Sequence, residues 1–148
     1  MKPASRFLAV VLCLAAACSA WSAVTFQPEV LLMRTSENAR DKSFKYATLK
    51  PVEVDDKTGF GTFNYRASAE GIVVDVTITV KKKAANGTLT VNVRVVRTKL
   101  NEAGGDQIAR NKDFTFRPGT SLIVDNDWRL KDRGPDGVAE ILQLTLVK

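Results

Sequence analysis

Four aspartates follow one another near the C-terminus in a spacing that could hold a calcium ion. They are Asp125, Asp127, Asp132 and Asp136. Counted from Asp125, the first, third and twelfth positions of a calcium-binding loop are acidic, but the sixth is Leu130, where such loops need glycine. Arg129 holds the fifth position, and Lys131 and Arg133 add further cations. We therefore predict a salt-bridged surface loop and no bound metal.

The other reactive side chains are few. The chain contains no histidine, which removes the usual general base, most zinc sites and any Ser-His-Asp triad. It also has no glycine-rich loop of the kind that binds phosphate. Two carboxylates could still meet in space to hydrolyse a glycosidic bond, but the acids are scattered over surface-like positions. We predict that the protein is not an enzyme and holds no cofactor.

Lysine and arginine residues cluster just before Asn86–Gly87 and recur along the segment that follows these two residues. They are Lys81, Lys82, Lys83, Arg94, Arg97, Lys99, Arg110 and Lys112. One interpretation is a stripe that binds an anionic envelope polymer or lipid headgroups. The other is a set of charged sheet edges that prevent aggregation. The formal net charge of +6 favours acidic surfaces but does not require a nucleic-acid partner, and we predict none.

Trp128 and Arg129 lie in the same polar segment as the aspartates. A tryptophan between charged residues in a long loop is either a platform for a sugar or a partner, or a lid that folds back on the core. The first interpretation adds both residues to the basic stripe. The candidate binding surface is then Lys81, Lys82, Lys83, Arg94, Trp128 and Arg129.

Residues 1–20 have the layout of a secretory signal peptide. Lys2 and Arg6 make a basic start, and residues 7–17 form an apolar run too short to span a bilayer. Small residues then lead to Ala20, where we predict cleavage. The protein is therefore expected to be exported to the periplasm or the extracellular space.

The same segment allows a second processing route. Residues 15–18 are similar to a lipobox, in which Cys18 would carry a lipid and tether the protein to a membrane. Cleavage after Ala20 would instead remove both cysteines, Cys13 and Cys18, and leave no thiol for a disulfide or a metal. In that case residues 21–148 form one all-β domain held together by its core alone.

A long hairpin is predicted to position the cations. Residues 71–82 and 88–100 alternate aliphatic and polar side chains with a period of two, which is typical of strands with one buried face. Asn86–Gly87 between them predicts a type I′ turn, because both residues tolerate positive φ. The alternation breaks at Val95–Val96, which predicts a β-bulge there.

Shorter strands are expected elsewhere along the chain. They are residues 30–34, 44–54, 59–68, 112–117, 121–125 and 138–147. Pro51 interrupts the second and indicates an edge or a bend, while Ser36–Lys42 predicts one helical turn capped by Ser36. About seven or eight strands with closely spaced turns predict an all-β fold, a single-domain antiparallel sandwich or a partly open barrel.

Four segments follow one another in an order known from a protein family. They are GIVVDVT at 71–77, NGTLTV at 86–91, FTFRPGTSLIV at 114–124 and AEILQLTLV at 139–147. Together, residues 59–148 resemble the β domain of secretins, the outer-membrane ring proteins of type II and type III secretion systems. The resemblance implies a stand-alone relative with a structural or partner-binding role rather than a gated pore.

These observations predict an exported, non-enzymatic envelope protein. Its expected role is structural or the binding of a partner, and the expected partner is another envelope protein in a secretion system or a surface assembly. The alternative is a binding module for an anionic polysaccharide or glycan, which depends on the basic stripe and Trp128. Contact with a membrane is expected only if Cys18 is lipidated.

Overall fold

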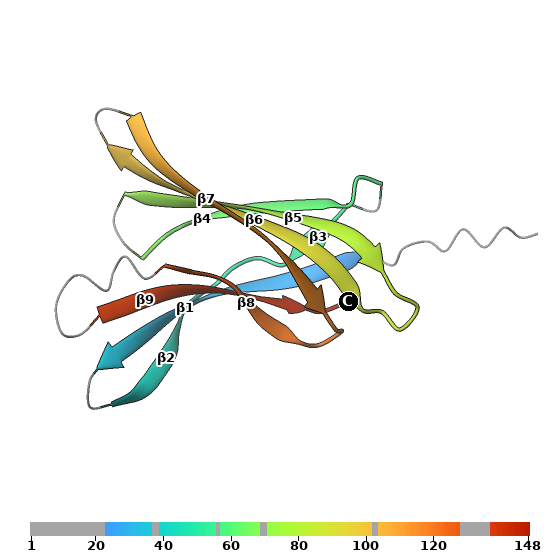
Figure 1. The fold of residues 1–148 in the computed structure, drawn as a ribbon, viewed down its shortest axis with the longest axis horizontal. Coiled ribbons are helices and arrows are strands. Elements are labelled where there is room, and N and C mark those ends of the chain that lie inside the picture. The colour runs from blue at the N-terminus through green and yellow to red at the C-terminus, as the bar shows by residue number, and fades with distance from the viewer. Residues whose placement is uncertain (1–22, 37–38, 56, 69–70, 102–103, 128–136) are drawn as a thin grey trace, which may run out of the picture.

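The computed structural model describes residues 23–36, 39–55, 57–68, 71–101, 104–127 and 137–148. Within these ranges the chain forms nine β-strands and no helix (Figure 1). Their bounds are β1 (Val24–Ser36), β2 (Ala39–Thr48), β3 (Val52–Val54), β4 (Phe60–Arg66), β5 (Ile72–Lys83), β6 (Leu89–Asn101), β7 (Gly104–Phe116), β8 (Ser121–Asp127) and β9 (Gly137–Leu146). Nothing in the described ranges could therefore cross a membrane as a helix.

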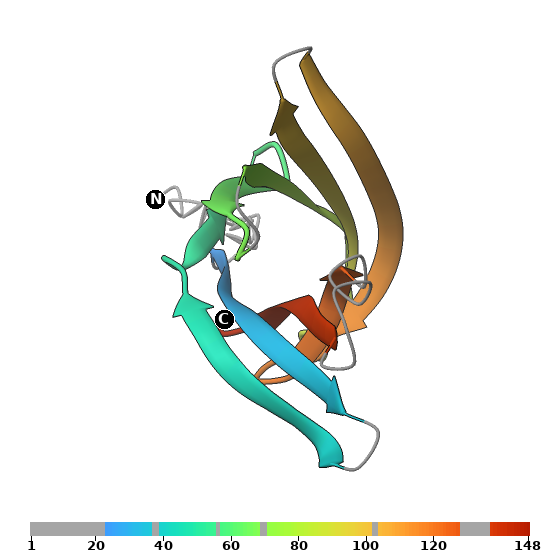
Figure 2. The same cartoon turned by 90° about the vertical axis from the view of Figure 1, so that its left-hand side faces the viewer.

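The strands form two antiparallel sheets that stack as a sandwich and do not close into a barrel. One sheet has the order β2-β1-β9-β8, with β3 also paired to β1, and the other has the order β4-β5-β6-β7. The chain crosses between the sheets from β3 to β4 and again from β7 to β8. Figure 2 shows both sheets curving around a common interior. The predicted all-β sandwich is confirmed.

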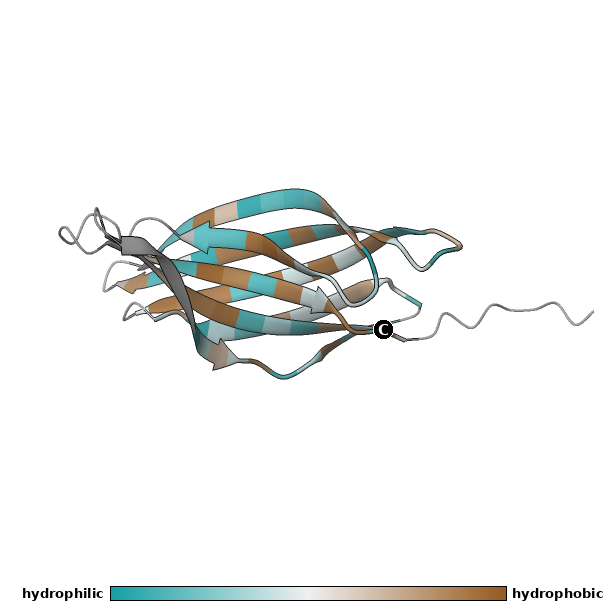
Figure 3. Cartoon of the chain, turned by 90° about the horizontal axis from the view of Figure 1, so that it is seen from below, coloured by the Kyte–Doolittle hydropathy of each residue, from teal (hydrophilic) through white to brown (hydrophobic). Residues whose placement is uncertain are grey.

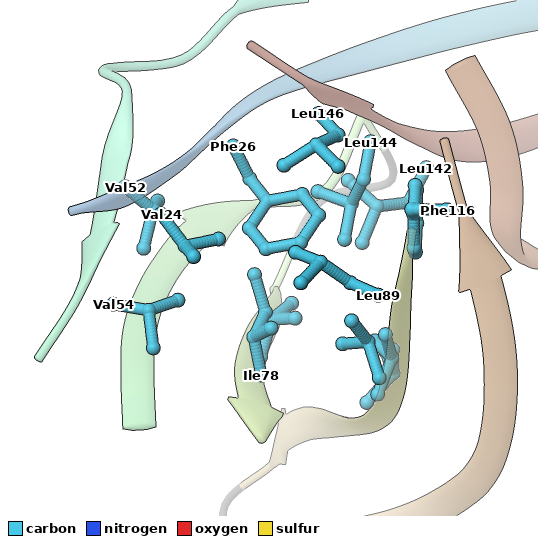
Figure 4. Packing of buried hydrophobic residues seen from close by; sticks show 14 of the residues in the cluster. Val24, Phe26, Val52, Val54, Ile78, Leu89, Phe116, Leu142, Leu144 and Leu146 are labelled. Atoms are coloured by element: carbon cyan, nitrogen blue, oxygen red, sulfur yellow. The ribbon is translucent and has the colours of Figure 1, made fainter. Parts of the chain in front are cut away.

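The core lies between the facing sides of the two sheets. Alternating aliphatic residues of β5 and β6 face inward, which confirms the predicted hairpin and produces the banded hydropathy pattern in Figure 3. Phe26 of β1 and Phe116 of β7 are both fully buried, and their rings meet edge to face with centroids 5.1 Å apart (Figure 4). Burying one such side chain contributes about 1.5–3 kcal/mol to the free energy of unfolding. The apolar core between the two sheets therefore provides most of the free energy that holds the sheets together.

The turn of the β5–β6 hairpin differs from the prediction. Gly87 has a φ of 82°, and no described residue other than glycine has a positive φ. The Gly87 N–H donates to the Ala84 carbonyl at 3.0 Å, and the Ala84 N–H donates to the Thr88 carbonyl at 2.8 Å. This is a type I turn followed by a left-handed glycine, so the predicted type I′ turn is wrong. The register shift lies between Val80 and Lys82 rather than at Val95–Val96.

Two predictions concern the segment after β1. Ser36 ends β1 and lies opposite Ala39 of β2, so the helical turn predicted for Ser36–Lys42 is wrong. One isolated helical turn has too few hydrogen bonds to compete with a continuous antiparallel ladder. The predicted interruption at Pro51 is confirmed, because β2 ends before it and β3 begins after it, and both pair with β1.

One side of the sandwich is closed where β3 approaches β4. At Gly61 of β4, a Cβ atom would lie 3.1 Å from Val52 Cγ1, 3.2 Å from the Glu53 carbonyl and 3.2 Å from Val54 Cγ2. These separations are shorter than ordinary van der Waals contact. The absence of a side chain at Gly61 therefore permits the two sheets to meet on this side.

We expect Gly61→Val to lower the free energy of unfolding by about 1–3 kcal/mol, because the added side chain forces β3 away from β4. Urea denaturation followed by circular dichroism measures this effect. Thr62→Val is the matched control, since Thr62 is exposed on the same strand. Equal stability of the two variants would show that β3 and β4 do not pack this closely.

Candidate functional site

The structure exposes four residues of the predicted binding surface. Lys81, Lys82 and Lys83 lie at the end of β5, and Arg94 lies on β6 opposite Thr77. Trp128 and Arg129, the other two members, lie outside the described residues. The structure thus shows the four basic residues as exposed on the β5–β6 hairpin, and their joint binding surface with Trp128 and Arg129 stays a prediction.

The basic stripe is partly neutralised by an acid from β7. The Lys81 Nζ forms an ion pair with Asp113 Oδ2 at 2.9 Å, and the Asn92 amide donates to Asp113 Oδ1 at 2.6 Å. These bonds, first from Asn92 and then from Lys81, lower the pKa of the exposed Asp113 carboxyl. Lys81 is therefore already bound to a carboxylate, which weakens its case as a free anion ligand.

Arg97 does not belong to an exposed stripe. Its residue is 3 % exposed and lies between the sheets. Arg97 Nε bonds to Asp125 Oδ2 at 2.9 Å, and Arg97 Nη1 bonds to Glu140 Oε1 at 3.0 Å. Placing Arg97 with the surface cations is thus wrong, because this guanidinium joins β6 of one sheet to β8 and β9 of the other.

Glu140 is the second member of this buried network and is 1 % exposed. The backbone N–H and the hydroxyl of Ser68 each donate to Glu140 Oε2 at 2.6 Å. The Tyr65 hydroxyl lies 3.5 Å from Glu140 Oε1. Both oxygens of the Glu140 carboxylate thus have protein donors, Ser68 on Oε2 and Arg97 on Oε1, as a buried carboxylate requires.

Protonation in this network is fixed by its surroundings. Burial raises the pKa of the Tyr65 phenol above its ordinary value, so the hydroxyl keeps its proton. Burial alone would lower the pKa of Arg97, but Tyr65, Glu140 and Asp125 together raise it. Arg97 therefore remains a cation between its two carboxylates.

Asp125 also departs from the sequence-based expectation. Its place in β8 agrees with the strand predicted for residues 121–125, but the predicted start of a salt-bridged surface loop is wrong for Asp125, because this residue is only 5 % exposed. Its Oδ1 binds Arg110 Nη1 at 2.9 Å, while Oδ2 binds Arg97. Asp132 and Asp136 lie outside the described residues. In the described ranges no group of acids is arranged to hold a metal ion.

The alternation of inward and outward side chains along a strand is the sequence signal that identifies Arg97 and Glu140 as buried charges. Arg97 continues the inward series of Val91, Val93 and Val95. Glu140 continues the inward series of Leu142, Leu144 and Leu146 in the same way. The break in apolar alternation that suggested a bulge at Val95–Val96 is instead an inward arginine. Asp125 turns inward because the β8–β9 register shifts between Ile123 and Asp125.

A groove of about 550 Å³ lies above this network, between β7 and β8. Its lining residues are Arg110, Asn111, Lys112, Phe114, Ile123, Val124, Asp125 and Asn126. β7 and β8 are the outermost strands of their sheets, and in the described part of the chain neither pairs with the other. The sandwich is thus closed at β3 and β4 and open at β7 and β8.

The backbone of β7 is paired on one side only. The Leu100 N–H of β6 donates to the Gly71 carbonyl at 2.7 Å, so even-numbered β6 residues direct their backbone groups toward β5. By alternation, odd-numbered residues such as Val93 share hydrogen bonds with β7, where Val93 lies opposite Lys112. Odd-numbered β7 residues therefore direct N–H and C=O groups outward. They are Gln107, Ala109, Asn111, Asp113 and Thr115.

Arg110, Lys112 and Phe114 of β7 line the groove, and Ile108 lies on the same face of the strand by alternation. Ile108 is 39 % exposed, and the Arg110 side chain is 48 % exposed. The Lys112 Nζ lies 5.5 Å from the centre of the Phe114 ring and forms no ion pair with a described residue. Arg110 Nη1 also donates to the Asn126 carbonyl on β8. The Arg110 guanidinium therefore spans the open side, Ile108 and Lys112 are exposed to solvent, and Phe114 is partly buried against the core.

Comparison with known proteins finds no family model, no curated protein and no solved structure similar to this chain. The resemblance to secretins therefore stays a prediction. The chemistry of the site has to be judged from its own groups. Asp125 and Glu140 are the carboxylates that the fold brings together, and both are buried and bound to Arg97. The groups that line the open side are the unpaired edge of β7, the cations Arg110 and Lys112, and the apolar residues Phe114, Ile123 and Val124.

Proposed function

We propose that this protein is an exported, non-enzymatic envelope protein that binds another protein along the open side between β7 and β8. The observation that carries the proposal is the unpaired edge of β7 beside a groove, with residues 105–113 all exposed. An exposed edge is a template for an additional strand. Proteins that use such edges gain affinity from main-chain hydrogen bonds and specificity from the side-chain pockets alongside.

The arrangement of the two edges supports a protein ligand. The β7 edge offers outward N–H and C=O groups in alternation, which a polypeptide backbone can match. On β8, the Asn126 carbonyl is already bound by Arg110, so β7 is the more available of the two. The alternative, an anionic polysaccharide on the basic stripe, is weakened because Arg97, one cation of that stripe, is buried. Lys81 and Arg110 each already bind one carboxylate, Asp113 and Asp125.

Export stays part of the proposal. The segment that predicts it, residues 1–20, lies outside the described residues. Cleavage after Ala20 gives a chain that begins at Trp21, whereas lipidation gives one that begins at Cys18. The mass of the mature protein distinguishes these two forms, and a chain that retains residues 1–20 would contradict export.

Site-specific photocrosslinking tests the proposed surface. With a photoreactive residue in place of Asn111, we expect one discrete adduct with another envelope protein in cells that produce this protein. Asn64 is the matched control, because it is an exposed asparagine on β4, the opposite edge of the same sheet. No adduct at Asn111, or equal adducts at both sites, would contradict the proposal.

A further inference from the structure

We infer that the open edge accepts an extended segment of the partner protein with acidic residues at two successive inward positions and an apolar residue on each side. This inference rests on the proposed function and adds the chemistry of the partner segment. It follows from the row of side chains on the inward face of β7. Arg110, Lys112 and Phe114 of this row line the groove, and Ile108 extends the row by strand alternation and is 39 % exposed.

The row has an order that a partner strand can match. It is apolar, cationic, cationic and apolar, and it has the same order when read in either direction. A strand added to β7 would place each inward side chain opposite one member, at a Cβ separation of about 4.5–5.5 Å. Opposite charges stabilise such pairs and like charges destabilise them. The matching segment is therefore apolar-x-acidic-x-acidic-x-apolar.

Both cations retain unused hydrogen-bonding capacity. Arg110 contacts Asp125 and Asn126 through Nη1, and its Nε and Nη2 make no hydrogen bond with a described residue. Lys112 makes no ion pair within the described ranges and rests near Phe114. Two donors that point into one open groove suit two carboxylates. Without residues 1–20, which contain Lys2, Arg6 and no acid, 20 basic and 16 acidic residues remain, and their excess of positive charge would also attract an acidic partner over longer distances.

A second copy of this chain matches the edge less well. Antiparallel pairing of two β7 strands centred on Asn111 would place Arg110 of one copy opposite Lys112 of the other. Centring the pair on Arg110 would place two arginines opposite each other. Both registers, which cover the groove most fully, bring like charges together. We therefore assign the edge to a different, acidic protein.

Three peptides of seven residues test the inference against the full-length protein by fluorescence anisotropy. VTETETV carries the matching order, VETTTEV has the same composition with the acids on the other face, and VTKTKTV reverses the charge. We expect VTETETV to bind about tenfold more tightly than VETTTEV, because two opposite-charge pairs form only in the first. VTKTKTV should bind more weakly than either.

Three variants sharpen the test. Lys112→Glu should weaken VTETETV and strengthen VTKTKTV. Ala109→Pro should abolish binding of VTETETV, because it removes an outward N–H while leaving the hydrogen bonds to β6 in place. Ala109→Val keeps that N–H and should bind normally. Circular dichroism should show that all three variants fold.

The outcomes separate this inference from the proposed function. If the three peptides bound equally and the Asn111 adduct still formed, the inference that the partner segment is acidic would be overturned. The proposed function would remain. Loss of the adduct itself would remove the proposed function. A dimer in sedimentation equilibrium that Ala109→Pro disrupts would make a second copy the occupant and overturn the inference. Dextran sulfate, an anionic polysaccharide, provides a last control. The inference would also be overturned if dextran sulfate displaced VTETETV and bound the Ala109→Pro variant as tightly as the unmodified protein.

Discussion

Replacing Arg97 with alanine is expected to lower the free energy of unfolding by about 3–5 kcal/mol. The substitution leaves Glu140 buried without its cation and removes one of the two cations that bind Asp125. An uncompensated buried carboxylate is costly because the protein interior solvates charge poorly. Urea denaturation followed by circular dichroism would measure the loss directly.

Two further variants isolate the role of the charge. Arg94→Ala removes an exposed arginine from the same strand and should change the free energy of unfolding by less than about 0.5 kcal/mol. Combining Arg97→Met with Asp125→Asn and Glu140→Gln removes all three buried charges and should restore much of the loss. Equal, small effects of Arg97→Ala and Arg94→Ala would contradict the buried network.

Val76→Asp is expected to prevent folding altogether. Val76 is 1 % exposed and lies between Val74 and Ile78 on the inward face of β5. A carboxylate there would have no cation and no hydrogen-bond donor in an apolar core. Burying an unpaired carboxylate costs more than the about 5–15 kcal/mol by which a folded domain is stable. Loss of the cooperative thermal transition is the expected measurement.

Thr77→Asp provides the control for Val76→Asp. Thr77 is the next residue, faces outward, and lies opposite Arg94 on β6. A carboxylate at this position meets solvent and a neighbouring cation, so stability should change little. Unfolding by both substitutions, or by neither, would mean that the inward and outward faces of β5 are assigned wrongly.

The sequence predicts the architecture well where the side-chain pattern is strong. The alternation in residues 71–82 and 88–100 sets both the strands and their buried faces, and Asn86–Gly87 marks the turn between them. The turn type could not be read in the same way, because asparagine and glycine also fit a type I turn followed by a left-handed residue. The helical turn at Ser36–Lys42 failed because pairing between distant segments outweighs local preference.

The residues that form the candidate site are harder to predict from the sequence than the fold is. Arg97 and Glu140 are in phase with buried aliphatic residues, so strand phase alone could have revealed them. Which arginine pairs with which carboxylate depends on how the two sheets stack, and no local pattern contains that information. The open side depends on topology as well, since β7 and β8 are edges only because neither pairs with the other in the described chain.

The molecule combines a buried core with one open side, between β7 and β8. Arg97 joins the two sheets through its carboxylates beneath the groove. Arg110 extends the same network to the surface, where it contacts Asp125 and the Asn126 carbonyl. A partner strand on β7 would therefore lie directly beside groups that the core holds in place, which reduces the entropy cost of binding.

The most direct test is the yield of the Asn111 photocrosslink in two variants of one residue. Ala109→Pro removes an outward N–H from the β7 edge, and Ala109→Val keeps it. If the partner binds as an added strand, the proline variant should lose the adduct while the valine variant retains it. An equal yield from both folded variants would contradict strand addition at β7.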